Sequence, residues 1–254
     1  MSGRSRHKTH GGIPHGSTLN FGSNLQIYYR WNEGITSESI TTTQEDDSTS
    51  TTTNVTTWAD QSSNANNATQ TTDENEPLLA SDNSLDFFDD GSNADYMNFT
   101  KFRVDNNTDF LTFIVCELRD ALTSTYLSDS GGEVLEMYQP SNHRFKTASG
   151  VTTIANNDDG GFQTGNDEKL LYIVHRTNGS TGNVIGYKNG KAADSSVTNA
   201  NFFDLSNLGS KNDASNFFDG KIYDIGVIEG TVSDEYRKRL EDHLICKHGL
   251  ERLA

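Results

Sequence analysis

The 254-residue sequence is poor in cysteine and lacks any long apolar run. Its two cysteines, Cys116 and Cys246, are too few for a disulfide framework, and we expect both to be free thiols. No apolar run approaches the ~20 residues of a bilayer-spanning helix, and the first residues lack the apolar core of a secretory signal. We therefore expect no transmembrane helix, no membrane partner and no ordinary secretion.

Basic residues are also scarce, since 20 Lys and Arg stand against 36 Asp and Glu, for a net charge of -16. Phosphate recognition needs clustered basic side chains, so nucleic acid is not an expected partner. Hydrophobic residues make up 32% of the chain and the mean hydropathy is -0.68. That is enough apolar material for one core wrapped in polar loops, and it argues against two independent cores.

The few basic residues are unevenly distributed along the sequence. Arg4, Arg6 and Lys8 fall in residues 1–22, a segment without an acidic residue or a periodic apolar pattern. The sequence predicts a flexible basic N-terminal arm over residues 1–22 and one domain over residues 23–254. The arm is either a solvated terminus or a segment whose three basic residues dock on an acidic partner surface.

Short apolar segments rich in branched and aromatic residues recur along the domain, separated by clusters of Asn, Asp, Gly and Ser. This pattern predicts many short β-strands. Residues 170–174 are apolar on both faces, as in a central strand, and the last candidate, residues 218–228, places Ile222 and Asp224 on one side. The other strand candidates are residues 25–31, 84–88, 95–99, 110–118, 133–138 and 151–154.

Two further segments have a clear local character. Asn189-Gly190 tolerates the positive φ angles of a type I′ turn, so it predicts a tight hairpin. Residues 37–57 are dominated by Thr and Ser, a composition that cannot bury a core. We expect this stretch to form a long excursion between strands or an extended edge.

One helix is predicted near the C-terminus. Ser233 can cap its start and Gly249 can end it. The residues between them have a single apolar stripe at helical spacing, which should pack on the body of the domain, and a polar face expected to point outward. The stripe consists of Tyr236, Leu240 and Leu244, and the polar face of Arg237, Lys238, Glu241 and Asp242.

Three segments resemble a known superfamily. Residues 58–70 (WADQSSNANNATQ) are similar to the pattern W-x-D-x-S-G-x-G-x-x-A, with Ser63 and Ala65 where glycine is commoner. Residues 186–191 (GYKNGK) are similar to Y-x-N-G-K, and residues 218–225 (FDGKIYDI) precede a helix ending in LICKHG. Together they resemble the concanavalin A-like lectin/glucanase superfamily, specifically the laminin-G-like domains of phage and bacterial proteins.

The resemblance implies an all-β fold, a two-sheet antiparallel jelly-roll sandwich of the concanavalin A-like type with one C-terminal helix. The matched residues have architectural roles in that fold, with Trp58 in the core, and none of them is a catalytic signature. Function therefore has to be argued from a site and not from the fold.

Signatures of catalysis are missing. Glycanases of this superfamily carry Glu-x-Asp-x-x-Glu on one strand, where alternation puts the carboxylates on one face, and no such motif occurs here. Glu133 and Glu136 are three apart and therefore on opposite faces of a regular strand. A nucleophile elbow, HExxH, P-loop and paired CxxC are absent as well. We expect a protein that is not an enzyme and has no cofactor.

Two kinds of binding site are candidates. Asp86, Asp89, Asp90 and Asp95 form the densest cluster of oxygen ligands and are candidates for a structural calcium site, with a solvated turn as the alternative.

Exposed aromatic rings could also stack on sugars. Tyr126, Phe162 and Phe202 are the candidates for a glycan site, with packing in the core as the alternative for each.

These observations favour a non-enzymatic bacteriophage virion structural protein, a capsid decoration or tail-associated component located in the virion. Its partners would be major capsid or tail proteins, with further copies of itself as another candidate. An acidic, hydrated exterior would keep particles apart by like-charge repulsion. The alternative is a carbohydrate-binding or host-receptor-binding lectin-like module with a surface glycan as its partner.

Overall fold

The computed structural model describes residues 24–43, 48–88, 94–119, 124–138, 142–147, 150–155, 168–178, 180–211 and 216–253. Within these ranges the chain forms eighteen strands, all paired antiparallel, and one α-helix, α1 (Asp234–His248). The first nine strands are β1 (Leu25–Tyr29), β2 (Ile35–Thr43), β3 (Thr49–Trp58), β4 (Ala68–Thr69), β5 (Leu78–Leu79), β6 (Leu85–Phe87), β7 (Met97–Val104), β8 (Phe110–Leu118) and β9 (Ser124–Ser128). The other nine are β10 (Val134–Tyr138), β11 (Asn142–Thr147), β12 (Gly150–Ala155), β13 (Leu170–Thr177), β14 (Asn183–Lys188), β15 (Lys191–Ala192), β16 (Val197–Thr198), β17 (Phe203–Leu208) and β18 (Gly220–Glu229).

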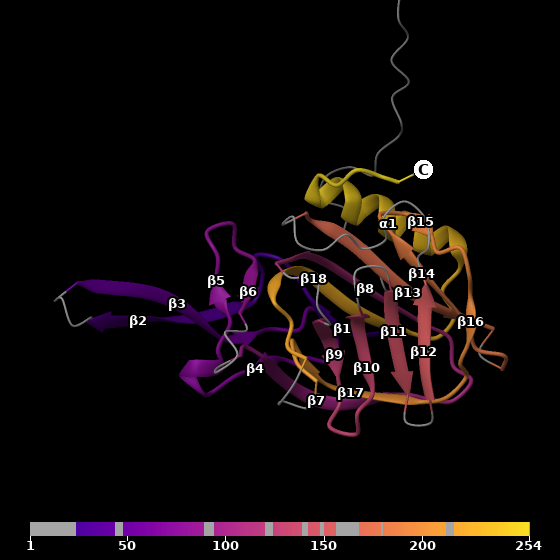
Figure 1. Ribbon diagram of the computed structural model, residues 1–254, viewed down its shortest axis with the longest axis horizontal. Coiled ribbons are helices and arrows are strands. Elements are labelled where there is room, and N and C mark those ends of the chain that lie inside the picture. Colours follow the sequence, from indigo (N-terminus) through magenta and orange to yellow (C-terminus); the bar gives the residue numbers. More distant parts are fainter. Residues whose placement is uncertain are drawn as a thin grey trace, which may run out of the picture.

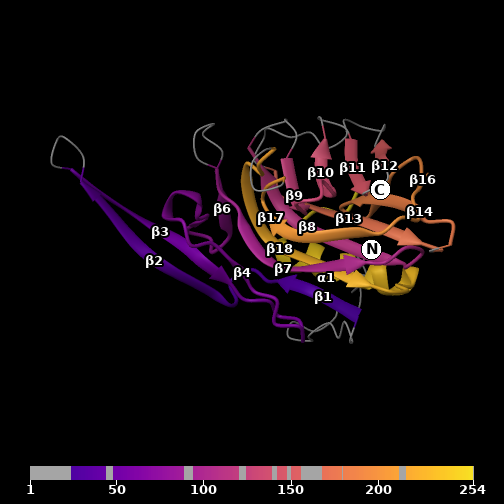
Figure 2. The same cartoon turned by 90° about the horizontal axis from the view of Figure 1, so that it is seen from below.

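The strands stack in two layers, with the helix lying on one of them (Figures 1 and 2). The helix-side sheet has β1 and β6 along one edge of β18, followed by β8, β13 and β14, which carries β15 and β16. The outer sheet runs β7-β17-β9-β10-β11-β12. Short strands β4, β5 and β6 join the layers into one hydrogen-bonded network. The all-β antiparallel sandwich with a C-terminal helix predicted from the sequence is confirmed.

Two hydrophobic cores follow from the alternation of side chains on the central strands. On β8, Ile114 and Cys116 enter the core between the sheets, whereas Phe113 and Val115 enter a second core under the helix. Because β13 alternates in the same way, both strands are apolar on both faces. The prediction that residues 170–174 form a central strand is therefore confirmed, as is the burial of Trp58.

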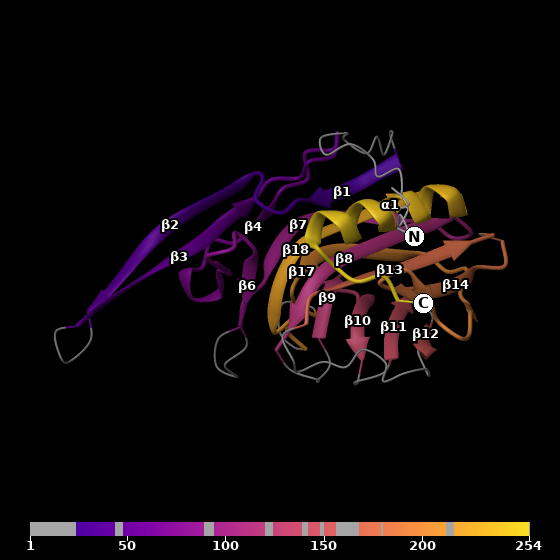
Figure 3. The same cartoon turned by 90° about the horizontal axis from the view of Figure 1, so that it is seen from above.

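The helix begins and ends as predicted. Ser233 Oγ accepts a hydrogen bond from the Tyr236 N–H at 3.1 Å, and Gly249 adopts φ 65° after the last turn. The helix lies along the helix-side sheet (Figure 3). Leu240 and Leu244 are fully buried in the core beneath it. Among the described residues no helix combines the length and the hydrophobicity needed to cross a bilayer.

The outward direction expected for Arg237 and Glu241 is wrong. Both side chains are buried, and they form an ion pair one helical turn apart. The guanidinium also lies 3.8 Å from the centre of the Tyr187 ring on β14. A charged pair can enter this interface because each member has a partner of opposite charge.

The alternation expected for β18 is interrupted by a β-bulge. The register against β8 shifts between Ile222 and Asp224, so Tyr223 and Asp224 both lie on the helix side, while Ile222 and Ile225 both enter the core between the sheets. Placing Ile222 and Asp224 on one side was therefore wrong, because the extra residue reverses the pattern.

The bulge directs Asp224 into a buried cluster that ties the helix end to the sheet. Its carboxylate accepts hydrogen bonds from Lys247 Nζ at 2.7 Å, from the backbone N–H of Trp31 at 3.0 Å and from His248 Nε2. Burial opposes ionisation of Asp224, but the hydrogen bond from His248 and the charge of Lys247 outweigh it and hold the pKa below its usual value. Asp224 is thus a charged anchor between β18, the β1–β2 turn and α1.

The Thr- and Ser-rich segment forms a long hairpin arm, β2–β3, that projects from the sandwich (Figures 1 and 3). β2 and β3 pair from Ile35↔Trp58 to Thr43↔Thr49. Other strands pair with β3 only near its base, β5 at Asn54 and β4 at Thr57 and Trp58. The outer half of the arm is therefore a two-stranded ribbon without flanking strands among the described residues.

Candidate binding groove

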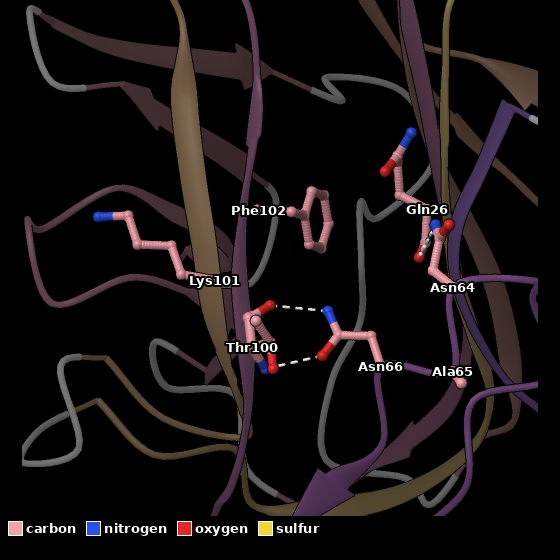
Figure 4. Close-up of a pocket in the computed structure, with 7 residues that line it drawn as sticks. All are labelled: Gln26, Asn64, Ala65, Asn66, Thr100, Lys101 and Phe102. Carbon is pink, nitrogen blue, oxygen red and sulfur yellow. Dashed lines mark hydrogen bonds between the residues drawn. The ribbon is translucent and has the colours of Figure 1, made fainter.

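A groove of about 240 Å³ lies where β1, the loop after β3 and β7 meet (Figure 4). Its lining combines one aromatic ring, Phe102 on β7, with the side-chain amides of Gln26 and Asn64 across from it, and Thr100 lies on the same strand as the ring. The residues that line it are Gln26, Asn64, Ala65, Asn66, Thr100, Lys101 and Phe102.

The Trp58-x-Asp60-x-Ser62 motif holds one wall of the groove in place. Asp60 Oδ1 accepts hydrogen bonds from the backbone N–H groups of Tyr28 and Ser62, both at 2.8 Å, and Asp60 Oδ2 accepts from the N–H of Asn66 at 2.9 Å. One buried carboxylate thus holds the loop against β1 and also holds two parts of the loop together. The motif is architectural, as the resemblance implied, and its effect is to position the groove residues that follow it.

Ala65 explains why the related pattern prefers glycine near this point. Its φ is 51°, in the left-handed region that costs a residue with a Cβ about 1–2 kcal/mol. The turn brings Asn66 against the edge of β7, where its amide donates to the Thr100 carbonyl and accepts from the Thr100 N–H, both at 2.7 Å. The side-chain amide of Asn66 therefore pairs with the edge of β7 as the backbone of a neighbouring strand would, and it closes the lower end of the groove (Figure 4).

An irregularity in β7 turns Phe102 toward the groove. Phe99 and Phe102 are three residues apart and would lie on opposite faces of a regular strand, but the register against β17 shifts between Leu205 and Asn207. The two rings consequently stack, with centroids 6.0 Å apart. Phe102 packs on the main core with one part of its ring and is half-buried, which keeps the rest of the ring at the groove.

Lys101 extends away from the ring of Phe102 (Figure 4). Its Nζ lies 2.9 Å from carboxylate oxygens of both Asp129 and Asp204, and these hydrogen bonds raise the pKa of Lys101. Asp204 also accepts two hydrogen bonds from Arg103. The charges on this side of β7 are therefore paired with one another, and the groove itself presents amides and an aromatic ring.

The residues predicted to bind calcium do not form a site in the described part of the chain. Asp86 pairs with Arg119, and Asp95 is buried with its Oδ2 accepting the Phe88 N–H at 2.8 Å. Both carboxylates therefore have protein partners. Asp89 and Asp90 lie outside the described residues.

Two of the three predicted glycan residues, Tyr126 and Phe202, lie in the described part of the chain. Tyr126 is 1% exposed, with its hydroxyl 3.1 Å from His143 Nε2, so its ring packs in the core and offers no face to a sugar. Phe202 is half-buried under the guanidinium of Arg103, whose central carbon is 4.2 Å from the ring centre. Phe162 lies outside the described residues, as do Arg4, Arg6 and Lys8 of the predicted arm.

The fold and the groove together define a class, a jelly-roll β-sandwich with a polar surface groove and a single covering helix. No family model and no curated protein sequence matches the chain. Structural neighbours are binding domains of clostridial toxins, which are lectin-like sandwiches, in agreement with the concanavalin A-like fold. The laminin-G-like subclass and the bacteriophage context stay predictions.

Three of these neighbours show the extent of the likeness. The receptor binding domain of botulinum neurotoxin D is 10% identical, with a TM-score of 0.55 over 89% of this chain and 54% of that one. The binding domain of botulinum neurotoxin DC in complex with SialylT is 15% identical, with a TM-score of 0.53 over 84% and 52%. The binding domain of Paraclostridial Mosquitocidal Protein 1 is 11% identical, with a TM-score of 0.51 over 87% and 52%. The chain spans about half the length of these structures, and the likeness is one of fold.

Proposed function

We propose that the chain is a non-enzymatic, lectin-like binding module that holds one sugar unit of a surface glycan in the groove. The observation that carries the proposal is the position of the Phe102 ring opposite the side chains of Gln26 and Asn64 (Figure 4). A pyranose ring has an apolar face that stacks on an aromatic ring, and hydroxyl groups around its rim that pair with amides. The ring of Phe102 and the side-chain amide of Gln26 offer these two kinds of contact, whereas Nδ2 of Asn64 already donates to the backbone carbonyls of Leu25 and Gln26 at 3.1 and 2.9 Å.

The size and charge of the groove support the same class of ligand. At about 240 Å³ it is smaller than the roughly 300–1,000 Å³ of pockets for drug-sized molecules, so it suits a single sugar unit of a longer chain. Neutral hydroxyl groups also suit a groove whose neighbouring charges are already paired. The neighbour described in complex with SialylT adds support for this ligand class.

Glycan binding is tested with Phe102→Ala and Gln26→Ala, probed first on an array of neutral and sialylated glycans and then by calorimetry with the best ligand. We expect Phe102→Ala to weaken Kd at least tenfold, about 1.4 kcal/mol. Gln26→Ala should weaken it about twofold to tenfold, the effect of one hydrogen bond.

The matched control is Phe88→Ala, which removes an exposed ring outside the groove and should leave Kd unchanged. Thermal melts establish that each variant is folded. A wild-type chain that binds no glycan on the array, or a Phe102→Ala variant that binds as tightly as Phe88→Ala, would rule out this function.

A second proposal, of virion assembly, is favoured by the hairpin arm. In this role the chain is a capsid decoration or tail-associated protein located in the virion, and the basic residues Arg4, Arg6 and Lys8 dock on an acidic surface of the particle. An isolated two-stranded ribbon is marginally stable, so the outer part of the β2–β3 arm would gain stability by lying on a neighbouring protein or on another copy of the chain.

The arm can be shortened without disturbing its base. Ser39 and Thr53 face one another in register, so a two-residue Asn-Gly turn can replace residues 40–52. We expect the shortened chain to melt within about 1 °C of the wild type, because Ile40, Thr41 and residues 48–52, whose burial the structure describes, are half-buried or exposed, and to lose incorporation into purified particles. Deletion of residues 1–22 tests the basic arm in the same assay. Incorporation of both variants at the wild-type level would exclude the assembly role.

A further inference from the structure

Three carboxylates meet at the base of the hairpin arm, away from the groove. Glu38 lies on β2, Asp73 begins the short 3-10 helix Asp73–Asn75, and Glu76 follows it. One oxygen of each carboxylate lies within 4.8 Å of an oxygen of the other two. Glu38 and Asp73 are exposed, so the cluster opens to solvent on one side.

Glu76 distinguishes this cluster from an ordinary acidic surface. The residue is 3% exposed, and its Oε2 is buried without a hydrogen-bond partner. A buried carboxylate oxygen without a donor costs about 1–3 kcal/mol or more, because it has lost its water. Burial, together with the negative charges of Glu38 and Asp73, outweighs a hydrogen bond from the Asn54 side chain and raises the pKa of Glu76. Either protonation of Glu76 or a bound cation would relieve the repulsion among the three carboxylates.

We propose that Glu38, Asp73 and Glu76 bind a calcium ion. Calcium takes six to eight oxygen ligands at about 2.3–2.6 Å in irregular geometry, so two oxygens on opposite sides of one ion are about 4.8 Å apart. The spacing of the three carboxylates thus falls within one calcium coordination shell. Magnesium needs regular octahedral geometry at about 2.0–2.1 Å and usually keeps several waters beside one or two carboxylates, so a cluster of three carboxylates suits it less. An all-oxygen set without nitrogen or sulfur also disfavours zinc.

Such an ion would couple the arm to the sandwich. On β3, Asn54 donates its side-chain N–H to the Asp73 carbonyl at 3.2 Å, and its Oδ1 accepts from Thr52 Oγ1 at 2.9 Å. These neutral contacts link β3 to the short helix, and the ion would add a charged link from β2 to the same segment. Calcium would therefore fix the direction in which the arm leaves the body.

The experiment compares thermal melts of the full chain after EDTA treatment, with and without added CaCl2 or MgCl2, and measures calcium binding by calorimetry. With a Kd of about 1 mM, 10 mM calcium should raise Tm by about 3–5 °C, and magnesium should raise it less. The variants Glu76→Gln and Asp73→Asn should lose the calcium response. Asp73 is exposed, so its variant should fold even if Glu76→Gln does not.

The matched control is Glu74→Gln, because Glu74 is an exposed acid in the same short helix but outside the cluster. It carries the same change in net charge and should keep the full calcium response. No calcium-dependent rise in the wild type would overturn the proposal. An equal rise in wild type, Asp73→Asn and Glu74→Gln would also overturn it, since that pattern indicates general screening of an acidic protein.

Discussion

Replacing Asp224 by alanine is expected to lower the free energy of unfolding by about 3–5 kcal/mol, the usual cost of removing one partner from a buried ion pair. The side chain of His248 is 1% exposed and that of Lys247 is 15% exposed, so neither cation regains full hydration when its partner is lost. The N–H of Trp31 loses its acceptor as well. For a domain of this size the loss corresponds to a fall in Tm of about 6–20 °C.

The matched control is Asp242→Ala, which removes an exposed carboxylate of the same helix that pairs with Arg252, a residue beyond the helix end. Surface pairs contribute about 0–1 kcal/mol, so this variant should melt within a few degrees of the wild type. Urea unfolding of both variants at pH 7 measures the difference. Equal stability of the two variants would mean that the Asp224 cluster does not anchor the helix.

The second large effect is expected on acidification. Burial, and then the charge of Arg237, lower the pKa of His175 to about 4 from its ordinary value of 6.5. Between these pH values the unfolded chain binds a proton that the folded chain does not. The contribution of His175 to stability is therefore complete above about pH 6.5 and is lost as the pH falls toward 4. At about 1.4 kcal/mol per pH unit, the loss is about 3 kcal/mol.

His143 adds to this effect, because full burial lowers its pKa well below 6.5. Asp224 contributes only at lower pH, since a depressed carboxyl pKa gives stability that is lost below about pH 4. Raised carboxyl pKa values, such as that of Glu241, work in the opposite direction. The pH dependence of the free energy of unfolding of the wild type is thus the sum of contributions from several titratable groups.

A comparison of variants isolates the histidine contribution. The free energy of unfolding is measured for the wild type and for His175→Gln at pH 8, 7, 6 and 5. At pH 8 the difference reports packing alone, because the imidazole is neutral in both states. We expect the wild type to lose about 2 kcal/mol relative to the variant by pH 5. A difference that stays constant over this range would show that His175 does not titrate as inferred.

Much of the fold could be predicted because its signals are local. The two apolar faces of residues 170–174, the Asn189-Gly190 turn and the caps Ser233 and Gly249 each depend on neighbouring residues, and the structure has all four features. In the turn, both residues have positive φ, 45° and 86°. Such preferences act within a few residues of the chain, so one sequence is enough to recognise them.

The sites could not be predicted in this way because they join distant segments. Gln26, Asn64 and Phe102 meet only through the stacking of the sheets, and Glu38 reaches Glu76 through the hairpin. Irregular register adds a second obstacle, since the shifts in β7 and β18 reverse the faces that strict alternation gives to Phe102 and Asp224. The Trp58 motif was the available signal for the groove, because Asn64 and Asn66 lie inside it.

The pairing of β1 with β18 has a consequence for how the chain folds during synthesis. Leu25 pairs with Ile228, about 200 residues later, so at about 5–20 residues per second the two are made about 10–40 s apart. β18 is also flanked by β8, so the helix-side sheet stays divided until the last strand arrives. Folding of the helix-side sheet should therefore wait until β18 has been made, and this long wait favours a chain whose unfolded form stays in solution, as its acidic, apolar-poor composition provides.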